Sequence, residues 1–198
     1  MKVWAALLLT LLFLALMAAF YLAHVWIFPV TVVLYAAVFD GVVAAVATAA
    51  IMLALRRRLP FGGFERLLLC CLWLLTGYTV AISVPTVLDR SLSFYILEKI
   101  QQRGGGIRAD RLGDVFVGEY MPEFRLVDVR LTEQIESGTV TLDNGCVRLT
   151  PRGEALASFS RFFRTNLLPK QRWLMDEKTD ALVDPFANSR KGVMGYEC

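Results

Sequence analysis

Residues 30–55 read VTVVLYAAVFDGVVAAVATAAIMLAL, a run in which Asp40 is the single charged side chain. A helix of about 20 apolar residues is long enough to cross the ~30 Å hydrocarbon core of a bilayer. A helix of a water-soluble protein normally keeps a polar face, and this run has none. The stretch therefore predicts a membrane-spanning helix.

Two further apolar runs flank this stretch. Residues 3–26 carry no charged side chain, and neither do residues 67–85. Each run is long enough to cross the hydrocarbon core as a helix. The sequence therefore predicts three transmembrane helices, at about residues 3–26, 30–55 and 67–85, within a membrane region of residues 1–86.

A cleaved signal peptide is the alternative for the first run. Ala15, Ala18 and Ala19 imitate the small residues of a cleavage site. The apolar stretch nevertheless far exceeds the about 7–15 residues of a typical signal-peptide core. We therefore prefer an uncleaved anchor.

The charges divide unevenly along the chain, which is 56% hydrophobic with a formal net charge of +3. Residues 1–86 hold five Lys or Arg and two acidic residues, whereas residues 87–198 hold 16 of each kind. The surplus positive charge thus belongs to the apolar part. This excludes a basic nucleic-acid-binding module as the origin of the pI near 8.7, and it excludes a disordered acidic protein.

The loop charges predict the orientation in the membrane. The connection at residues 27–29 has no Lys or Arg, whereas the loop at residues 56–66 has four arginines. Loops rich in Lys and Arg stay on the cytoplasmic side. We therefore expect a cytoplasmic N-terminus and an extracytoplasmic C-terminal part, in a bacterial inner membrane as the alanine- and leucine-rich spans suggest.

Small residues form a stripe along the predicted second span. Ala37, Gly41, Ala45 and Ala49 recur every four residues, and Asp40 lies on the neighbouring stripe. Small side chains let a second helix approach closely. We expect these five residues to contact a protein partner in the bilayer.

Asp40 has two alternative interpretations. A carboxylate in the hydrocarbon core costs at least ~2.5 kcal/mol and normally faces protein or water. In the first alternative, Asp40 is protonated, or it is hydrogen-bonded within the bundle to His24, to Tyr35 or to neighbours near Thr48. In the second, Asp40 and His24 serve a membrane enzyme or a transporter subunit. One His and one Asp do not make a metal site.

The part after the membrane region alternates between helices and a hairpin. Pro85 is expected to end the third span, and Asp89 or Ser91 to cap a following helix. Asn144-Gly145 between two alternating runs predicts a β-hairpin. The expected elements are a helix at about 92–103, an extended piece at Ile107, helices at about 109–117 and 122–137, a hairpin at 139–149, and a helix at 150–163 with Leu156, Phe159 and Phe163 facing inward.

This order resembles the winged helix-turn-helix family. The resemblance rests on Ile135-Glu136-Ser137-Gly138, followed by Val147-Arg148-Leu149-Thr150-Pro151-Arg152-Gly153 with its LTPxG turn, and covers about residues 91–165. It implies a small α+β domain at residues 87–168, before a tail at residues 169–198. The predicted fold class is a mainly α membrane protein, with three transmembrane helices followed by this winged-helix-like domain.

In DNA-binding members of that family the third helix reads DNA, and the wing touches the backbone. The exposed positions of the corresponding helix here carry four acids and two arginines, and the turn at residues 143–145 has no basic residue. Phosphate contacts need positive charge, so we prefer a protein-binding surface. Its candidate residues are Arg125, Asp128, Arg130, Glu133, Asp143 and Arg148. The alternative is a membrane-tethered DNA-binding transcription regulator, which requires an even number of crossings.

The sequence carries no recognisable catalytic set. Residues 87–198 lack histidine, and the chain has no G-x-S-x-G, no phosphate-binding G-x-x-x-x-G-K and no C-x-x-C. Whether Cys146 and Cys198 pair is left open. We expect a non-catalytic integral membrane accessory or assembly subunit of an envelope complex, which binds the lipid bilayer and a protein partner and has no cofactor, metal or nucleic-acid ligand.

Overall fold

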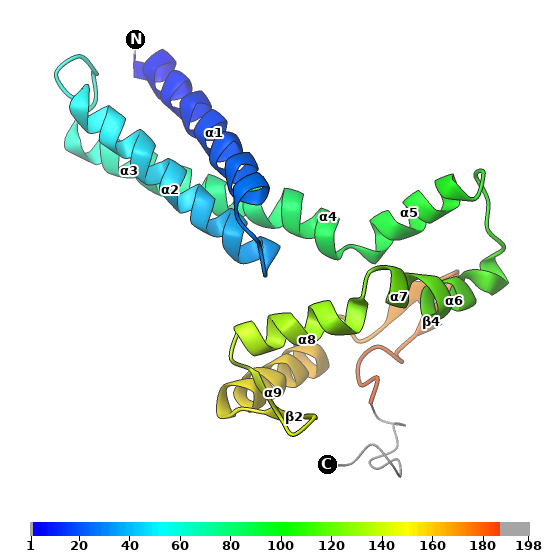
Figure 1. Cartoon of the computed structure of the whole chain (residues 1–198). Helices are drawn as coiled ribbons and strands as arrows, with labels where there is room; N and C mark the ends of the chain where they lie inside the picture. Colours follow the sequence, from blue (N-terminus) through cyan, green and yellow to red (C-terminus); the bar gives the residue numbers. More distant parts are fainter. Residues whose placement is uncertain (1, 187–198) are drawn as a thin grey trace. The chain divides into compact units, whose positions relative to one another are not determined.

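Three long helices begin the chain in the computed structural model, which describes residues 2–186 (Figure 1). They are α1 (Lys2–Ile27), α2 (Val33–Ala54) and α3 (Gly63–Ala81). All three are long and apolar enough to cross a membrane. The three predicted spans are thus present as helices. The chain divides into two units, one through Tyr120 and one from Met121, and each is described by itself.

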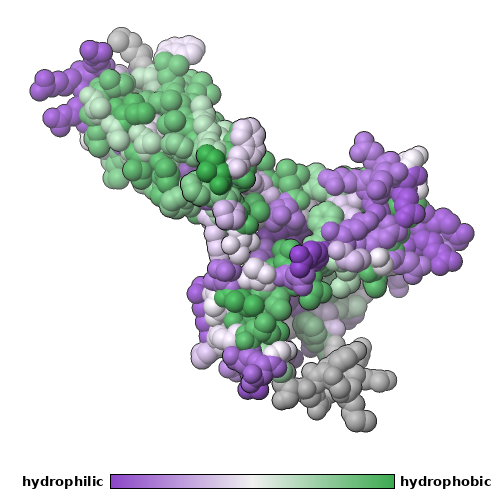
Figure 2. Space-filling view, in the orientation of Figure 1, coloured by the Kyte–Doolittle hydropathy of each residue, from purple (hydrophilic) through white to green (hydrophobic). Residues whose placement is uncertain are grey.

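The three helices pack around a small core of large side chains. Phe13 of α1 stacks on Trp73 of α3 with 6.3 Å between ring centroids, and both side chains are fully buried. The indole Nε1 of Trp73 donates to Thr10 Oγ1 at 3.1 Å. Most other Leu, Val and Phe side chains point outward, and Figure 2 shows the resulting hydrophobic surface. Such a surface is stable in lipid and not in water.

Two glycines bring α2 and α3 into close contact. A Cβ placed on Gly41 would lie 3.4 Å from the Cα of Gly77, and one on Gly77 would lie 3.5 Å from the Cα of Gly41. Backbones approach this closely only where side chains are minimal. Gly77 was not among the predicted site residues, yet it completes the helix contact that the stripe on α2 implied.

Pro85 does not end the third helix, contrary to the prediction. The chain continues through a π-turn, η1 (Ile82–Thr86), into α4 (Val87–Arg90), so that the apolar helix extends over Gly63–Arg90. Proline removes the N–H that the carbonyl of Ala81 would otherwise accept. The hydroxyl of Thr86 donates to that carbonyl at 2.8 Å instead. Because the orphaned carbonyl is satisfied, the helix can pass the proline.

The first unit ends in short helices around an aromatic cluster. The Ser91 side chain caps α5 as predicted by accepting from the backbone N–H of Phe94. Tyr120 packs against Tyr95 and Phe116, with ring centroids 4.5 and 5.1 Å away. The elements are α5 (Leu92–Gln102), η2 (Ala109–Arg111), α6 (Leu112–Val115) and η3 (Phe116–Tyr120).

The second unit is built from helices and two hairpins. Its elements are α7 (Met121–Glu123), α8 (Leu126–Glu136), β1 (Val140–Asp143), β2 (Cys146–Leu149), α9 (Pro151–Asn166), β3 (Arg172–Leu174) and β4 (Glu177–Thr179). The β1–β2 hairpin is confirmed, and both turn residues, Asn144 and Gly145, have positive φ angles of 51° and 79°. The β3–β4 hairpin was not predicted, because its strands have three residues each.

The winged-helix arrangement itself is not established. Each sheet in residues 2–186 has two strands, so no strand at Ile107 joins the β1–β2 hairpin. The helix expected from Pro122 is interrupted: α7 ends at Glu123, and α8 begins at Leu126 after Arg125 in the left-handed conformation. The structure therefore shows a small helix-and-strand region, and the winged-helix arrangement stays a prediction.

Gly153 joins α9 to the hairpin. Thr150 caps α9, because its hydroxyl accepts from the backbone N–H of Gly153 at 3.1 Å and donates to the carbonyl of Gly138 at 2.8 Å. A Cβ on Gly153 would overlap the carbonyl oxygen of Thr139. The last position of the LTPxG turn thus requires glycine for steric reasons.

We predict that Gly153→Ala loosens the hairpin, because the added methyl group must push Thr139 away, at a cost of about 1–3 kcal/mol. Hydrogen–deuterium exchange of the full-length protein in detergent should become at least about fivefold faster for peptides covering residues 139–153, the factor that about 1 kcal/mol corresponds to. Gly118→Ala is the matched control, since a Cβ there meets open space. Equal exchange in the two variants would contradict the steric role of Gly153.

Candidate functional site

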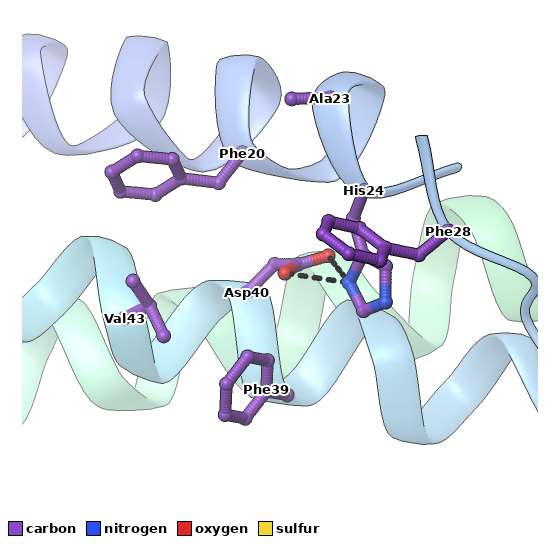
Figure 3. Close-up of a pocket in the computed structure, with 7 residues that line it drawn as sticks. All are labelled: Phe20, Ala23, His24, Phe28, Phe39, Asp40 and Val43. Carbon is purple, nitrogen blue, oxygen red and sulfur yellow. Dashed lines mark hydrogen bonds and ion pairs between the residues drawn. The ribbon is translucent and has the colours of Figure 1, made fainter. Parts of the chain in front are cut away.

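The candidate site is an ionisable pair inside the membrane bundle (Figure 3). His24 lies in the last turn of α1, and Asp40 lies two turns into α2. The Nδ1 atom of His24 is 2.9 Å from one carboxylate oxygen of Asp40 and 3.1 Å from the other. The Asp40 side chain is 5% exposed and that of His24 is 24% exposed. The pair is therefore buried on its acidic side and accessible on its imidazole side.

A hollow of about 400 Å³ opens beside this pair. Phe28 and Phe39 both meet the His24 ring edge-on, with ring centroids 5.8 and 6.3 Å away. Apart from the pair, the lining side chains are apolar: Phe20, Ala23, Phe28, Phe39 and Val43. The only polar groups of the lining are thus the imidazole and the carboxylate.

The geometry determines which nitrogen of His24 is available. The hydrogen bond between His24 and Asp40 is made through Nδ1 of the imidazole. The second nitrogen, Nε2, points away from Asp40 (Figure 3). A hydrogen bond to one ring nitrogen fixes the orientation of the imidazole. The contact with Asp40 thus holds the His24 ring in the lining of the hollow.

The depth of the pair follows from its position on the helices. Asp40 comes seven residues after Val33, the first residue of α2, which corresponds to about 10 Å at 1.5 Å per residue. His24 is three residues from the end of α1. In a bilayer about 30 Å thick, the pair therefore lies in the third of the span nearest the loop of residues 28–32.

Among the partners considered for Asp40, the structure shows His24. The carboxylate is bonded to His24, whereas the hydroxyl of Thr48 donates to the carbonyl of Ala44 at 2.8 Å. Residues 2–186 contain no group of three or more His, Cys, Asp or Glu side chains that could hold a metal ion. Asp40 and His24 therefore form a two-residue site.

The stripe of small residues lies mostly inside the bundle. Ala37, Gly41 and Ala45 are buried, and Ala49 packs partly buried against the same core. The helix neighbour that the stripe predicted is thus present within the chain, as Gly77 of α3 shows. A contact of these residues with a separate protein stays a prediction.

The predicted binding residues on α8 form ion pairs with one another. Arg125 lies 2.8 Å from Asp128, and Arg130 lies 2.8 Å from Glu133. Both pairs have i,i+3 spacing on the helix, where neighbouring side chains meet. They bring four of the six candidates together as two separate pairs along the helix.

The β1–β2 hairpin has one polar and one apolar face. Residues directly opposite each other on paired strands share a face. The predicted site residues Asp143 and Arg148 therefore lie on the polar face, together with their partners across the hairpin, Cys146 and Thr141. The apolar face consists of Val140, Leu142, Val147 and Leu149. Cys198 lies outside the described residues, so its pairing with Cys146 is not tested.

Sequence reasoning missed how much of this apolar surface is exposed. Leu149 is 63% exposed and Phe159 of α9 is 60% exposed. Leu156 and Phe163 are also exposed, so the expectation that these α9 residues face inward was wrong. The hydrophobic patches are visible on the surface in Figure 2. The alternation in VTLD and CVRL was the available signal, but it identifies a face without showing what covers it.

An ion-pair cluster stabilises the end of the first unit. Lys99 is buried and lies 2.8 Å from Glu119, and Arg103 approaches the other oxygen of Glu119 at 2.6 Å. Hydrogen bonds from Lys99, and then from Arg103, lower the pKa of Glu119 below its ordinary value. The carboxylate is thus held ionised between two cations, which gives the cluster a structural role.

Comparisons with protein-family models, curated proteins and solved structures found no match. The proposed function therefore rests on the sequence and geometry of this chain.

We predict that His24 and Asp40 are energetically coupled. His24→Leu should lower the thermal stability of the detergent-solubilised protein, because Asp40 loses its hydrogen-bond partner while buried. The double variant His24→Leu/Asp40→Leu should regain wild-type stability or exceed it, since an apolar pair removes the desolvation cost. The expected coupling is about 0.5–3 kcal/mol. Additive losses in the double variant would contradict the pairing.

Proposed function

We propose that the protein is a non-catalytic membrane-anchored accessory or assembly subunit whose C-terminal unit binds another protein. The observation that carries the proposal is the exposed apolar surface of that unit, formed by one face of the β1–β2 hairpin and by Leu156, Phe159 and Phe163 of α9. Contiguous apolar patches on a part of a protein outside the membrane mark interaction sites. Aromatic side chains are enriched in such interfaces.

The charge distribution supports a protein ligand over DNA. The arginines of α8 that would contact phosphates are each engaged by an acid one turn away. The turn of the β1–β2 hairpin, at residues 143–145, carries Asp143 and no cation. Binding to DNA requires several cations free to neutralise phosphates. The transcription-regulator alternative is therefore the weaker one.

The proposed setting is an envelope complex in a bacterial inner membrane. We place the loop that contains Arg56, Arg57 and Arg58 in the cytoplasm, because such loops are retained there. Three crossings then put the residues after α4 on the opposite side. The membrane helices anchor the subunit, and the C-terminal unit meets its partner outside the cytoplasm.

We predict that a periplasmic reporter such as alkaline phosphatase, fused after Cys198, is active in cells. The same reporter inserted after Arg58 should be inactive, because that loop stays in the cytoplasm. Enzymatic activity normalised to the amount of each fusion protein is the measurement. Activity at Arg58 and silence after Cys198 would invert the proposed orientation. Silence at both positions would indicate an even number of crossings and favour the regulator.

We predict that a photo-crosslinking amino acid at Phe159 of the full-length protein gives a discrete adduct with another polypeptide in intact cells. The matched control is Ala157, which is exposed on the opposite side of α9. An apolar interface requires the adduct at Phe159 and none at Ala157. Leu156→Asp should reduce the adduct at Phe159 several-fold, because a charge desolvated in an interface is unfavourable.

Two outcomes would overturn the proposed interface. One is a crosslink from Phe159 to another segment of the same chain, identified by mass spectrometry, which would show that the chain covers this surface itself. The other is equal labelling at Phe159 and Ala157, which would show that contacts at α9 are nonspecific.

A further inference from the structure

The positive charges of the membrane bundle gather at one of its ends. Figure 2 shows hydrophilic side chains at the end of the hydrophobic bundle that holds the start of α1 and the α2–α3 loop. Lys2 of α1 lies 2.7 Å from Glu65 of α3, so these two charges offset each other. The remaining cations of this end are Arg56, Arg57, Arg58 and Arg66. The end therefore carries a surplus of positive charge.

The arginines of the α2–α3 loop differ from the cations that follow the membrane region. There, arginines are paired with acids, as Arg108 is with Asp110 at 2.7 Å. Within residues 2–186, by contrast, Arg56, Arg57 and Arg58 form no ion pair with a carboxylate, and all three are exposed. The guanidinium group stays protonated in proteins. The loop thus offers permanent charges to an anionic ligand.

An apolar groove of about 280 Å³ begins at the same end of the bundle. Its walls are formed by Val3 and Ala6 of α1 and by Leu68 and Leu72 of α3. It reaches from Glu65 to Leu72, which corresponds to about 10 Å along the helix axis at 1.5 Å per residue. One leaflet contributes about 15 Å of the hydrocarbon core. The groove therefore follows most of the depth of one leaflet.

Arg66 connects the charged loop to the groove. Its Nη2 atom donates to the carbonyl oxygen of Phe61 at 2.8 Å and lies 3.4 Å from that of Arg56. The side chain of Phe61 is buried and lines the groove. One guanidinium thus holds the first arginine of the loop beside the residue that lines the end of the groove.

The charges and the groove together define the chemistry of a ligand. Guanidinium groups match the geometry of phosphate oxygens through paired hydrogen bonds. The exposed walls at Val3, Leu68 and Leu72 suit a flexible apolar chain that lies in the bilayer. Basic sites between transmembrane helices bind the head groups of anionic lipids. A zwitterionic lipid carries a cation beside its phosphate, which the arginines repel. The complementary ligand is therefore a phospholipid with a net negative head group.

We propose that the groove between α1 and α3 binds an acyl chain of an anionic phospholipid, whose phosphate contacts the arginines of the α2–α3 loop. The site is independent of the protein-binding surface proposed for the C-terminal unit. It is also independent of the proposed orientation, because charge and groove lie at the same end of the bundle whichever side that end faces. It gives the membrane bundle a specific lipid ligand in addition to its anchoring role.

Native mass spectrometry of the full-length protein in detergent tests the proposal, because it counts the lipid molecules bound to each protein molecule. The probes are phosphatidylglycerol and phosphatidylcholine with identical acyl chains, added in equal amounts. They differ only in the head group, which is anionic in the first and zwitterionic in the second. We expect at least about fivefold more of the phosphatidylglycerol adduct, since each arginine near an anionic lipid contributes to binding.

Charge variants test the head-group contact. The double variant Arg57→Gln/Arg58→Gln should lower the preference for phosphatidylglycerol several-fold, because two cations of the loop are lost. The matched control, Arg108→Gln/Arg111→Gln, removes the same amount of charge from side chains that are paired with acids outside the membrane bundle. It should keep the preference of the wild type.

A substitution in the groove tests the contact with the acyl chain. Leu68→Trp places a larger side chain in the groove and should lower the phosphatidylglycerol adduct several-fold. Leu67→Trp is the matched control, because Leu67 is exposed at nearly the same depth on α3 and does not line the groove. Circular dichroism of each variant verifies that its helical content equals that of the wild type.

The outcomes decide the proposal in either direction. A preference for phosphatidylglycerol that falls in Arg57→Gln/Arg58→Gln and in Leu68→Trp, and persists in both controls, supports it. Equal adducts of the two lipids would overturn it. Equal losses in the two charge variants would also overturn it, because binding would then depend on total charge alone. An adduct that Leu68→Trp leaves unchanged, or that an equimolar amount of glycerol phosphate displaces, would show that the groove is not part of the site.

Discussion

Hydrocarbon offers no hydrogen-bond partner, so every polar group of the membrane bundle must be satisfied within the bundle. A few hydrogen bonds within the bundle meet this constraint. Trp73 donates to Thr10, and Thr86 donates to the carbonyl that Pro85 leaves without a partner. Asp40, which would be costly alone, is bonded to His24. These contacts join α1 to α3 and α1 to α2, and the glycine contact joins α2 to α3.

The second unit is under the opposite constraint, because its apolar groups, and not its polar groups, lack suitable surroundings. In water its polar groups find partners easily, and apolar surface is unfavourable. Here the hairpin presents Val140, Leu142, Val147 and Leu149 on one face, and α9 exposes three large side chains. In residues 121–186, Thr139 and Gly153 are the buried positions. A unit with so little interior leaves much apolar surface exposed, which is why we propose a binding role for it.

Local rules carried much of the sequence analysis. Hydropathy located the three long helices, and Ser91, Thr150 and Asn144-Gly145 placed two helix starts and a turn correctly, because each of these signals acts within a few residues. The prediction that Pro85 ends the helix was wrong, since the compensating hydrogen bond of the Thr86 hydroxyl has no sequence signature. The contact between His24 and Asp40 could be named only as one possibility, because it depends on how α1 aligns against α2. The exposure of α9 is likewise a tertiary property that periodicity does not contain.

The membrane bundle and the C-terminal unit offer different surfaces for a physical reason. A partner helix in the bilayer needs small residues that allow close approach, and Ala37, Gly41 and Ala45 are already packed within the bundle. What the bundle offers to the lipid is mainly aliphatic surface, with the imidazole of His24 as a polar group at its hollow. We therefore assign the proposed protein contact to the C-terminal unit, where the exposed surface is apolar and aromatic.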